Sequence, residues 1–442
     1  MHFIETNELT EMKTAMIPLT PEEVRAHIPI MEKYIYVDNA ATTPIPIPVL
    51  DAIKEYVYDY PANIERGAYS IAAIASEKVD QARENIAKLL LNCKPGEFIL
   101  TRNETEGGNF IAHALRSPLL NREKESFEEM ELPIKWNPGD EILCTVLEHH
   151  SNLLPWIRLA RQVKAELKIV YPEKTGVLRP EDFNPLINKR TKLVAFQHAS
   201  NVMGTVHPVK EIIKQIREVN PEPLIFIDGS QGPGHMPVDV KALECDFYAF
   251  SGHKGPLGIP GTGGLYIRGG LIEKLDPAEI GGGTIADVTV SDYKLRSDSY
   301  GKRWDAGTPN IIGYLALGRA AVYVAKEIGL KNIEKQELKL TKLLMEEAKQ
   351  IKNLEFYGPS TMKNKTGIFS FNIKGWNSQE LSLAMDENWK IQVRGGHHCA
   401  IPAMRWLGIH DTYGGTARIS FHYFNLESDV QKCVEALKVL SE

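Results

Sequence analysis

The sequence lacks the features that would place the protein in a membrane, on nucleic acid or outside the cell. It has no uninterrupted apolar run of about 18 residues, the length typical of a membrane-spanning helix. Basic residues are not in excess, since 51 Lys and Arg against 57 Asp and Glu give a formal net charge of −6. Nucleic-acid binding without sequence preference requires a basic surface, so we expect neither that activity nor membrane association. The polar, acidic N-terminus is not typical of a signal peptide.

Cysteine is scarce and irregularly spaced. The five cysteines are Cys93, Cys144, Cys245, Cys399 and Cys433, an odd number without any CxxC pair. This pattern argues against a disulfide framework and predicts a reducing, cytoplasmic location. A cysteine with a function is therefore expected to act as a thiol.

The rest of the composition is that of a globular protein. Hydrophobic residues make up 43% and charged residues 24% of the chain, which excludes a disordered or fibrous protein. At about 100 to 200 residues per domain, the length predicts two or three domains.

Short β-branched or aromatic runs alternate with helix-period segments in the middle of the chain. The predicted strands are Glu97–Thr101, Glu141–Leu147, Leu193–Gln197, Leu224–Ile227, Phe247–Phe250 and Gly264–Ile267. The predicted helices include Ser76–Leu91, Leu153–Val163 and Pro208–Val219. This alternation predicts an α/β fold in which helices cover a mostly parallel sheet.

The pattern becomes mainly helical after residue 310. The segments Ile311–Ile328, Leu330–Ile351 and Ser428–Leu440 have helical spacing, and Phe369–Ile373 and Ala417–Tyr423 are predicted strands. We therefore expect a large domain over residues 40–310. Residues 1–39 and 311–442 are expected to form a smaller α/β domain, joined to the first by a long helix over about 310–328. The polar stretch Ser117–Trp136 is predicted to be a surface insertion.

Polar residues follow four of the predicted strands directly. The segments are Glu148-His149-His150, His198-Ala199-Ser200-Asn201, Asp228-Gly229-Ser230-Gln231 and Ser251-Gly252-His253-Lys254-Gly255. Ligands of open α/β sheets bind beyond the carboxyl ends of the strands. The sequence thus delivers an imidazole, an amide, a carboxylate and an amine to one edge of the sheet.

Pyridoxal phosphate would need this combination of groups. Lys254 would form a Schiff base with the aldehyde, and Asp228 would keep the pyridine nitrogen protonated. Gln231 or Asn201 would donate to the phenolic oxygen, and His149 would stack on the ring.

A phosphate site is expected where the Glu97–Thr101 strand leads into a helix. Residues 103–109 should form the connecting loop, with the helix over Phe110–Leu115. Free amides and the Thr105 hydroxyl at a helix N-terminus would bind the phosphate, and Ser251 and His253 would add donors.

Each of these residues alone has an ordinary explanation. A Lys after a strand usually faces solvent, an Asp at a strand end often caps a helix, and a single His is usually structural. Their joint placement at successive strand ends favours the cofactor site.

The C-terminal part adds Cys399 beside His397 and His398 in a glycine-containing loop. Nearby positive charge would increase the thiolate fraction of this cysteine. The alternatives are an inert buried thiol or part of a zinc site, although no second ligand pair has zinc spacing, and we expect no metal here. Arg418 could bind a substrate carboxylate with two hydrogen bonds, or form a surface salt bridge.

Together these segments resemble the class V aminotransferases, which are fold type I pyridoxal phosphate enzymes. Within that family, the His397–Ala400 segment is most similar to the sulfur-assembly type (group II) cysteine desulfurases, which include selenocysteine lyases. The resemblance runs from about Tyr36 to the C-terminus. Its motifs are VDNAATTP (37–44), Arg66-Gly67, Thr105-Glu106-Gly107, residues 148–152 with Pro155-Trp156, residues 200–204, 228–231, 251–254, 306–310, 394–400 and Arg418.

The resemblance implies a fold and a set of roles. The large domain would hold a mostly parallel seven-stranded sheet. Lys254 would carry the cofactor and move the α-proton, with His149 assisting. Cys399 would take sulfur from L-cysteine as a persulfide, leaving L-alanine. Arg394, Arg418 and Asn201 would surround the substrate carboxylate.

The resemblance also implies partners. Thr308 of a neighbouring subunit would complete the phosphate site, so a homodimer is expected, and a sulfur-acceptor protein would receive the sulfur. Three positions depart from the family pattern: Glu104 where a small hydroxyl residue is usual, Glu65 where His is common, and Gly395 where Thr is usual.

Other functions remain open on the sequence. The substrate could be selenocysteine, or the same scaffold could catalyse a transaminase, racemase or other β-lyase reaction. A non-catalytic scaffold would lack bound cofactor and its visible absorption.

Overall fold

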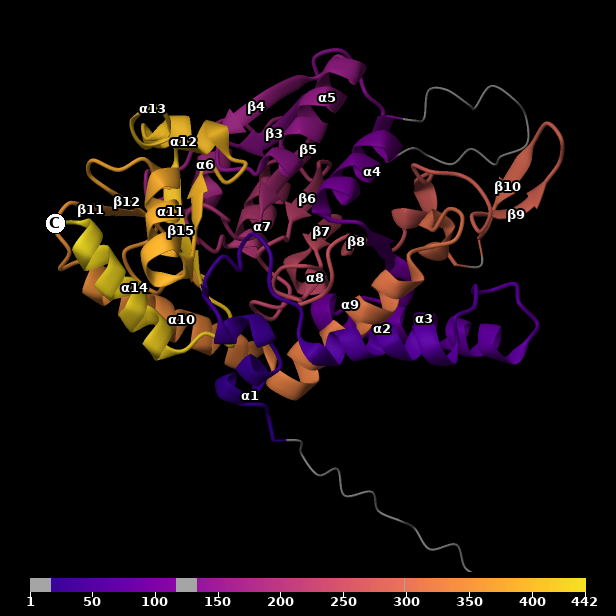
Figure 1. Cartoon of the computed structure of the whole chain (residues 1–442). Coiled ribbons are helices and arrows are strands. Elements are labelled where there is room, and N and C mark those ends of the chain that lie inside the picture. Colours follow the sequence, from indigo (N-terminus) through magenta and orange to yellow (C-terminus); the bar gives the residue numbers. More distant parts are fainter. Residues whose placement is uncertain (1–16, 117–132, 298) are drawn as a thin grey trace, which may run out of the picture.

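The computed structural model describes residues 17–116, 133–297 and 299–442. A seven-stranded sheet lies at the centre of the molecule (Figure 1). In spatial order its strands are β2 (Phe98–Thr101), β8 (Gly263–Ile267), β7 (Phe247–Ser251), β6 (Leu224–Asp228), β5 (Thr191–Gln197), β3 (Glu141–Thr145) and β4 (Glu166–Val170).

The sheet is mostly parallel, as predicted. Strands β4, β3, β5, β6 and β7 run parallel to one another, and β8 is antiparallel to both β7 and β2. All six predicted strands are present with bounds shifted by at most two residues. The seventh, β4, was not predicted because its short sequence, ELKIV, alternates polar and apolar residues at the edge of the sheet.

Helices pack on both faces of this sheet and at its ends (Figure 1). In the N-terminal two thirds of the described chain the helices are α1 (Pro21–Ala26), α2 (Ile47–Asp59), α3 (Ser70–Leu91), α4 (Glu104–Arg116), α5 (Leu154–Val163), α6 (Pro180–Phe183), α7 (Val209–Val219) and α8 (Val240–Leu243). A hairpin of β9 (Ile285–Val288) and β10 (Tyr293–Leu295) projects from the molecule next to the start of α3.

The start of α4 corrects the expected loop over residues 103–109. The helix begins at Glu104, and the Asn103 side chain caps it by accepting a hydrogen bond from Glu106 N at 3.0 Å. The two glycines at 107 and 108 argued against a helix, because glycine is a poor helix former. At Gly107 the reason is packing, since a Cβ there would lie 2.9 Å from the Cβ of Ala249.

A second, four-stranded sheet lies in the C-terminal part. Its antiparallel strands are, in order, β11 (Leu354–Tyr357), β12 (Ile368–Ile373), β15 (Thr416–Ser420) and β14 (Arg394–Gly396). The helices of this part are α9 (Ile311–Val322), α10 (Leu330–Ala348), α11 (Ser378–Trp389), α12 (Ile401–Leu407), α13 (His410–Tyr413) and α14 (Glu427–Leu440). The predicted strand Ala417–Tyr423 ends early, at Ser420, because His422 and Asn425 form a turn in which His422 N donates to Asn425 Oδ1.

The predicted connecting helix is continuous from Ile311 to Ile328, with a π-helical last part from Tyr323. The described N-terminal residues lie against the C-terminal part of the chain. Strand β1 (Ile35–Tyr36) pairs in parallel with β13 (Ile391–Gln392), and Arg25 forms an ion pair with Asp429. These contacts agree with the expected small domain, whose limits at 39 and 311 stay a prediction.

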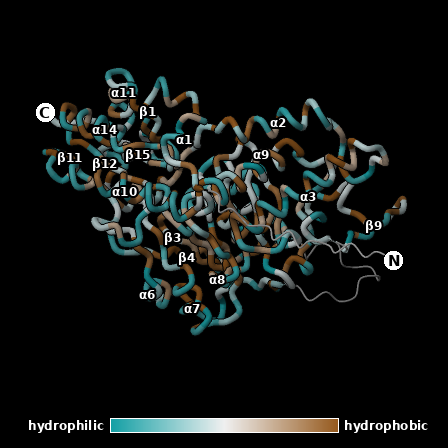
Figure 2. The backbone as a smooth tube through the Cα atoms, turned by 90° about the horizontal axis from the view of Figure 1, so that it is seen from below, coloured by the Kyte–Doolittle hydropathy of each residue, from teal (hydrophilic) through white to brown (hydrophobic). Residues whose placement is uncertain are grey.

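Hydrophobic segments concentrate in the interior around β3 and β4 (Figure 2). The two faces of the central sheet and the C-terminal sheet each contribute to a buried apolar cluster. No helix in the described part of the chain is both long and apolar enough to cross a bilayer. Most of the predicted surface insertion, residues 117–132, lies outside the described residues; Trp136 at its end donates to Leu115 O at 3.0 Å.

Candidate active site

The four polar segments of the sequence lie at one edge of the central sheet. They follow β3, β5, β6 and β7, which are adjacent and parallel, so their carboxyl ends are neighbours. The pairing places Gln197, at the end of β5, beside Asp228, at the end of β6. The predicted convergence of these segments is therefore present in the fold.

Lys254 and Asp228 form the centre of the site. Their charges lie close enough to act on each other's pKa. Burial lowers the pKa of Lys254, opposed by Asp228, so a larger fraction of the amine is neutral at a given pH. The loop that carries the lysine is held by Thr43, whose hydroxyl donates to Lys254 O at 2.7 Å. The result is a nucleophilic amine beside a carboxyl group.

Asp228 is 4% exposed, and its Oδ1 accepts a hydrogen bond from Ser230 N at 2.8 Å. Burial raises the pKa of Asp228, whereas the contact with Ser230 and the charge of Lys254 lower it. A buried carboxyl with one free oxygen is suited to pair with a protonated ring nitrogen.

His149 is neutral and its tautomer is fixed. It caps the 3-10 helix His150–Asn152 by accepting a hydrogen bond from Ser151 N at Nδ1, at 3.1 Å. Nδ1 is therefore an acceptor, and the proton is on Nε2. Burial lowers the pKa of His149 to about 3, and the charge of Lys254 acts in the same direction. A neutral, partly buried imidazole is suited to stack on a ring.

Two of the predicted phosphate ligands, Thr105 and Ser251, lie at the N-terminus of α4. Glu104 N donates to Ser251 Oγ at 3.2 Å, and the hydroxyls of Thr105 and Ser151 are 2.6 Å apart. His253 lies within the same loop as Lys254 and contacts Thr42 Oγ1 through Nδ1 at 3.1 Å. Hydroxyl groups at a helix N-terminus are a favourable environment for an anion, and the Ser151 hydroxyl is an addition that the sequence argument missed.

Both candidate amides are buried and already hold part of the protein. Gln231 Nε2 donates to Ala40 O at 2.8 Å, and Asn201 Nδ2 donates to His398 O at 2.9 Å. Each amide oxygen has no hydrogen-bond partner among the described residues. Buried polar atoms without partners are costly in a folded protein, so a ligand that contacts these amides would offset that cost.

Cys399 is exposed, whereas the other four cysteines are buried. His398 and Cys399 both have positive φ, 50° and 55°, which is uncommon for residues other than glycine. The strained turn is anchored to the sheet edge because His150 N donates to Cys399 O at 2.7 Å. A second bond, from Asn201 Nδ2 to His398 O at 2.9 Å, holds the same turn, so Cys399 lies at the sheet edge that carries the His149 and Asn201 segments.

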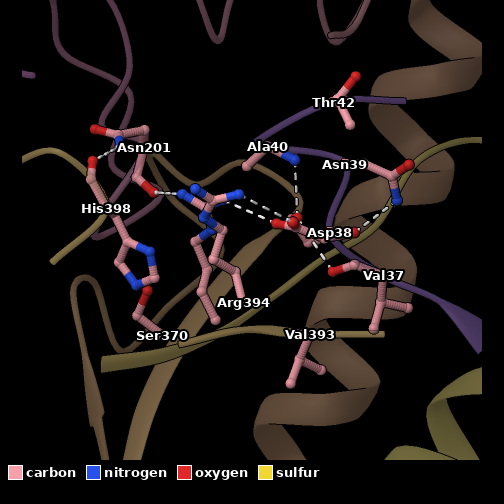
Figure 3. A network of polar contacts seen from close by, with 12 residues as sticks. Val37, Asp38, Asn39, Ala40, Thr42, Asn201, Ser370, Val393, Arg394 and His398 are labelled. Carbon is pink, nitrogen blue, oxygen red and sulfur yellow. Dashed lines mark hydrogen bonds and ion pairs between the residues drawn. The ribbon is translucent and has the colours of Figure 1, made fainter. Parts of the chain in front are cut away.

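Arg418 lies in the middle of β15 and is 2% exposed, so the alternative of a surface salt bridge is wrong. It donates to Asp38 Oδ1 at 3.0 Å and to Asn201 O at 2.9 Å. The exposed Arg394 lies 3.7 Å from the other oxygen of Asp38, which thus bridges the two guanidinium groups (Figure 3). Sequence reasoning did not assign Asp38, although it lies in the quoted motif over residues 37–44.

Thr308 does not join these residues within one chain. It lines a cavity of about 230 Å³ with Glu65, Arg66 and Lys302, and neither Lys254 nor Asp228 is among the described residues that line it. Glu65 lies 3.6 Å from Lys302 Nζ there.

Gly395, which departs from the family pattern, has a packing reason, since a Cβ at this position would lie 2.3 Å from Ser378 O.

Glu104 is a second carboxyl group inside the site. It is 2% exposed and its Oε1 has no partner among the described residues. Burial raises its pKa well above the ordinary value, and the negative charge of Asp228 adds to this effect. The raised pKa favours the protonated, neutral form of this side chain, which reduces the repulsion that a carboxylate would exert on a phosphate.

Replacing Glu104 with glutamine is expected to stabilise the cofactor-free protein in a pH-dependent way. Because the pKa is raised on folding from 4.5, the unfolded chain loses the proton first, and Glu104 destabilises the fold increasingly as pH rises above that value. The gain in E104Q should reach about 1–3 kcal/mol at alkaline pH, the usual cost of an unsatisfied buried group.

Urea unfolding of the cofactor-free variants at mildly acidic and mildly alkaline pH would measure this gain. Glu106→Gln is the matched control, because Glu106 lies in the same helical turn but pairs with Arg102. An E104Q gain that is equal at both pH values would contradict a raised pKa.

The residues present fit pyridoxal phosphate. A buried carboxyl and an amine with a lowered pKa act on each other, a neutral imidazole feels the charge of that amine, and the helix N-terminus nearby carries three hydroxyl groups. These are the groups that hold the ring nitrogen, the aldehyde carbon, the ring face and the phosphate of such a cofactor.

Comparison with known proteins gives this arrangement a family. The aminotransferase class-V family matches residues 35–433. A probable cysteine desulfurase of Methanothermobacter thermautotrophicus is 38% identical over 426 residues, 96% of this chain and 99% of that protein. A cysteine desulfurase of Shigella sonnei is 33% identical over 426 residues, 94% and 97% of the two chains.

Solved structures are also similar to this one. The apo cysteine desulfurase of Thermococcus onnurineus NA1 has a TM-score of 0.87 and 38% identity, over 96% of this chain and 99% of that chain. A cysteine desulfurase of Escherichia coli in an S-sulfonic acid form has a TM-score of 0.81 and 28% identity, over 95% and 98%. The chain belongs to the aminotransferase class-V family, where its relatives are named cysteine desulfurases.

Proposed function

We propose that the protein is a pyridoxal phosphate-dependent cysteine desulfurase, which converts L-cysteine to L-alanine and takes the sulfur onto Cys399. The observation that supports this most directly is an exposed thiol, Cys399, whose backbone oxygen is bonded to His150 N at the sheet edge that also carries Lys254. A transaminase or racemase would need the amine and the carboxyl group but no thiol.

Lys254 would hold the cofactor and then act as a base. Bound pyridoxal phosphate supplies an aldehyde that condenses with amines and a protonated ring that accepts electrons from the substrate. With the substrate bound, the Lys254 amine would take the α-proton. Its lowered pKa favours the neutral form that this step requires.

Asp228 and His149 would set the electronic state of the ring. Asp228 has one carboxylate oxygen bonded to Ser230 N and one available to hold the proton on the ring nitrogen. His149 presents a neutral ring whose Nε2–H is directed by the bond at Nδ1, so it can stack and assist proton transfer.

The substrate carboxylate would bind at the arginine pair. Arg418 is buried and fixed by Asp38 and Asn201, and Arg394 is exposed. One buried and one solvent-exposed guanidinium could together bind a carboxylate while the substrate enters from solvent. The Asn201 side-chain amide has two N–H groups, of which one donates to His398 O, so the second would be available to the carboxylate.

Cys399 would then attack the sulfur of the substrate. A bond forms between the two sulfur atoms and the Cβ–S bond breaks, with its electron pair left on the carbon, which is protonated to give alanine. The thiol of Cys399 becomes a persulfide, so atoms balance without an external oxidant. The strained backbone at His398 and Cys399 holds the thiol at the site edge, where an acceptor protein could take the sulfur.

Two wider features belong to the same proposal. Thr308 and the cavity next to it would serve the phosphate site of a second copy, which makes the enzyme a homodimer. The five unpaired cysteines, all within the described residues, suit a reducing cytoplasm.

Product analysis of the purified protein tests this function. With L-cysteine and a reductant we expect equal amounts of alanine and sulfide. With selenocysteine we expect alanine and selenide, and the ratio of the two rates gives the preference. Keto acids from a panel of amino acids, without alanine from cysteine, would instead identify a transaminase. A colourless protein that takes up no pyridoxal phosphate would exclude the proposal.

A further inference from the structure

Three buried polar side chains meet behind the loop that carries Lys254. They are His235 in the turn after β6, Glu337 in α10, and His422 just after β15, which are 6%, 2% and 0% exposed. One ligand atom from each lies within 4.8 Å of the others, and among the described residues this is the single group of His, Cys, Asp and Glu with such spacing.

The two imidazoles each have one nitrogen engaged and one without a partner. His422 Nε2 contacts Gly255 O at 3.0 Å, so it carries the proton and Nδ1 is a bare acceptor. His235 Nδ1 lies 2.9 Å from Glu337 Oε1. Both His422 Nδ1 and His235 Nε2 are buried without a hydrogen-bond partner among the described residues. Two such atoms in one core cluster are costly, and therefore call for a physical explanation.

This pattern is that of metal-binding histidines. A histidine ligand usually donates its second N–H to a carbonyl or a carboxylate, which fixes the tautomer and orients the ring. His422 does this with Gly255 O, which leaves its Nδ1 free to bind an ion. The charged or titratable groups that act on this cluster are Lys254, Glu334 and the imidazoles themselves.

We infer that His235, Glu337 and His422 form a binding site for a divalent first-row transition metal ion, with Zn²⁺ the preferred ion. Two imidazoles and one carboxylate are ligands of this class of ion. Tetrahedral zinc with bonds of about 2.0–2.2 Å requires ligand atoms roughly 3.3–3.5 Å apart. The separations in the cluster, from 2.9 Å to at most 4.8 Å, reach this geometry with side-chain shifts of about an ångström.

The site would connect the two sheets of the molecule at the catalytic lysine. Gly255 follows Lys254, and a Cβ on it would lie 2.6 Å from the His235 ring and 2.9 Å from His235 N. His422, two residues after the end of β15, contacts the same residue, and Glu337 belongs to α10. A metal ion would thus fix α10 and the end of β15 against the lysine loop, as a structural and not a catalytic ion.

Metal analysis of the whole protein tests the site. After expression with added zinc, holoenzyme dialysed without chelator is expected to retain one zinc per chain. Expression with cobalt in place of zinc should give the visible d–d absorption of Co²⁺ in a nitrogen and oxygen site, at longer wavelengths than the cofactor. His422→Phe and Glu337→Gln should each lose most of the metal.

His207→Phe is the matched control. His207 is a buried histidine with an unpartnered Nε2 outside the cluster, so its replacement should leave the metal content unchanged. If the cluster variants fail to fold, thermal unfolding of the wild type decides: removal of zinc with a chelator should lower the melting temperature, and zinc should restore it. A dialysed wild type without stoichiometric zinc or cobalt, or cluster variants that retain it, would overturn the inference in favour of a neutral hydrogen-bonded cluster.

Discussion

Lys254→Ala is expected to form no measurable alanine from L-cysteine. The variant loses both the amine that holds the cofactor and the base that moves the α-proton, and base assistance alone typically contributes about 10²–10⁴-fold. The remaining residues of the site, including Asp228 and His149, are held by contacts that do not involve the lysine side chain. The variant should therefore fold and still bind the cofactor without a covalent bond.

Rates of alanine formation and the visible spectrum measure this effect together. The matched control is Lys365→Met. Lys365 is also buried and its pKa is lowered to about 7, but its amine donates to Met203 O and has no role in the proposed reaction. We expect a folded K365M protein to keep its activity. Alanine formation by Lys254→Ala within tenfold of the wild type would remove the lysine from the chemistry.

The central part of the site could be predicted because it depends on a simple property of sheets. Parallel strands bring their carboxyl ends to one edge, so the residues after each strand are neighbours wherever the chain goes between them. Lys254, Asp228, His149 and Asn201 follow four such strands, and the structure places them at this edge. The alternation of β-branched or aromatic runs with helix-period segments was sufficient to find these four strands in the sequence.

The parts that were missed depend on contacts between distant segments. Asp38 pairs with Arg418 across 380 residues of sequence, and neither residue type indicates such a pairing by itself. The start of α4 was misplaced because Gly107 has low helix propensity, and only the close approach of Ala249 explains it. The cluster of His235, Glu337 and His422 joins three elements that no local pattern connects.

Thr308 illustrates a different limit. Its assignment came from the family resemblance, and within one chain it lines a cavity that shares no residue with the Lys254 site. A second copy of the chain would have to bring Thr308 to the Lys254 site. Neither the sequence pattern nor the fold of one chain describes a contact between two copies. The role of Thr308 thus stays a prediction that depends on the dimer.

Cys399→Ala is expected to lose sulfide release from L-cysteine while it keeps the cofactor and its spectral response to the substrate. Lys254, Asp228 and Arg418 are held by contacts that do not involve the Cys399 side chain, so substrate binding and α-proton removal should remain. Without the thiolate there is no acceptor for the sulfur, and the Cβ–S bond stays intact. Selenide release from selenocysteine is expected to survive, because the C–Se bond is weaker.

Selective labelling can locate the transferred sulfur. Burial raises the pKa of the other four thiols, Cys93, Cys144, Cys245 and Cys433, so they stay protonated and inaccessible. After one turnover without reductant, an alkylating reagent should therefore find one modified cysteine, and mass spectrometry should show one added sulfur on the peptide that contains Cys399. Cys93→Ala, which removes a buried thiol, should carry the same modification. Full sulfide release by Cys399→Ala, or the added sulfur on another cysteine, would contradict a persulfide at Cys399, since an exposed thiol at the site would then have no part in the transfer.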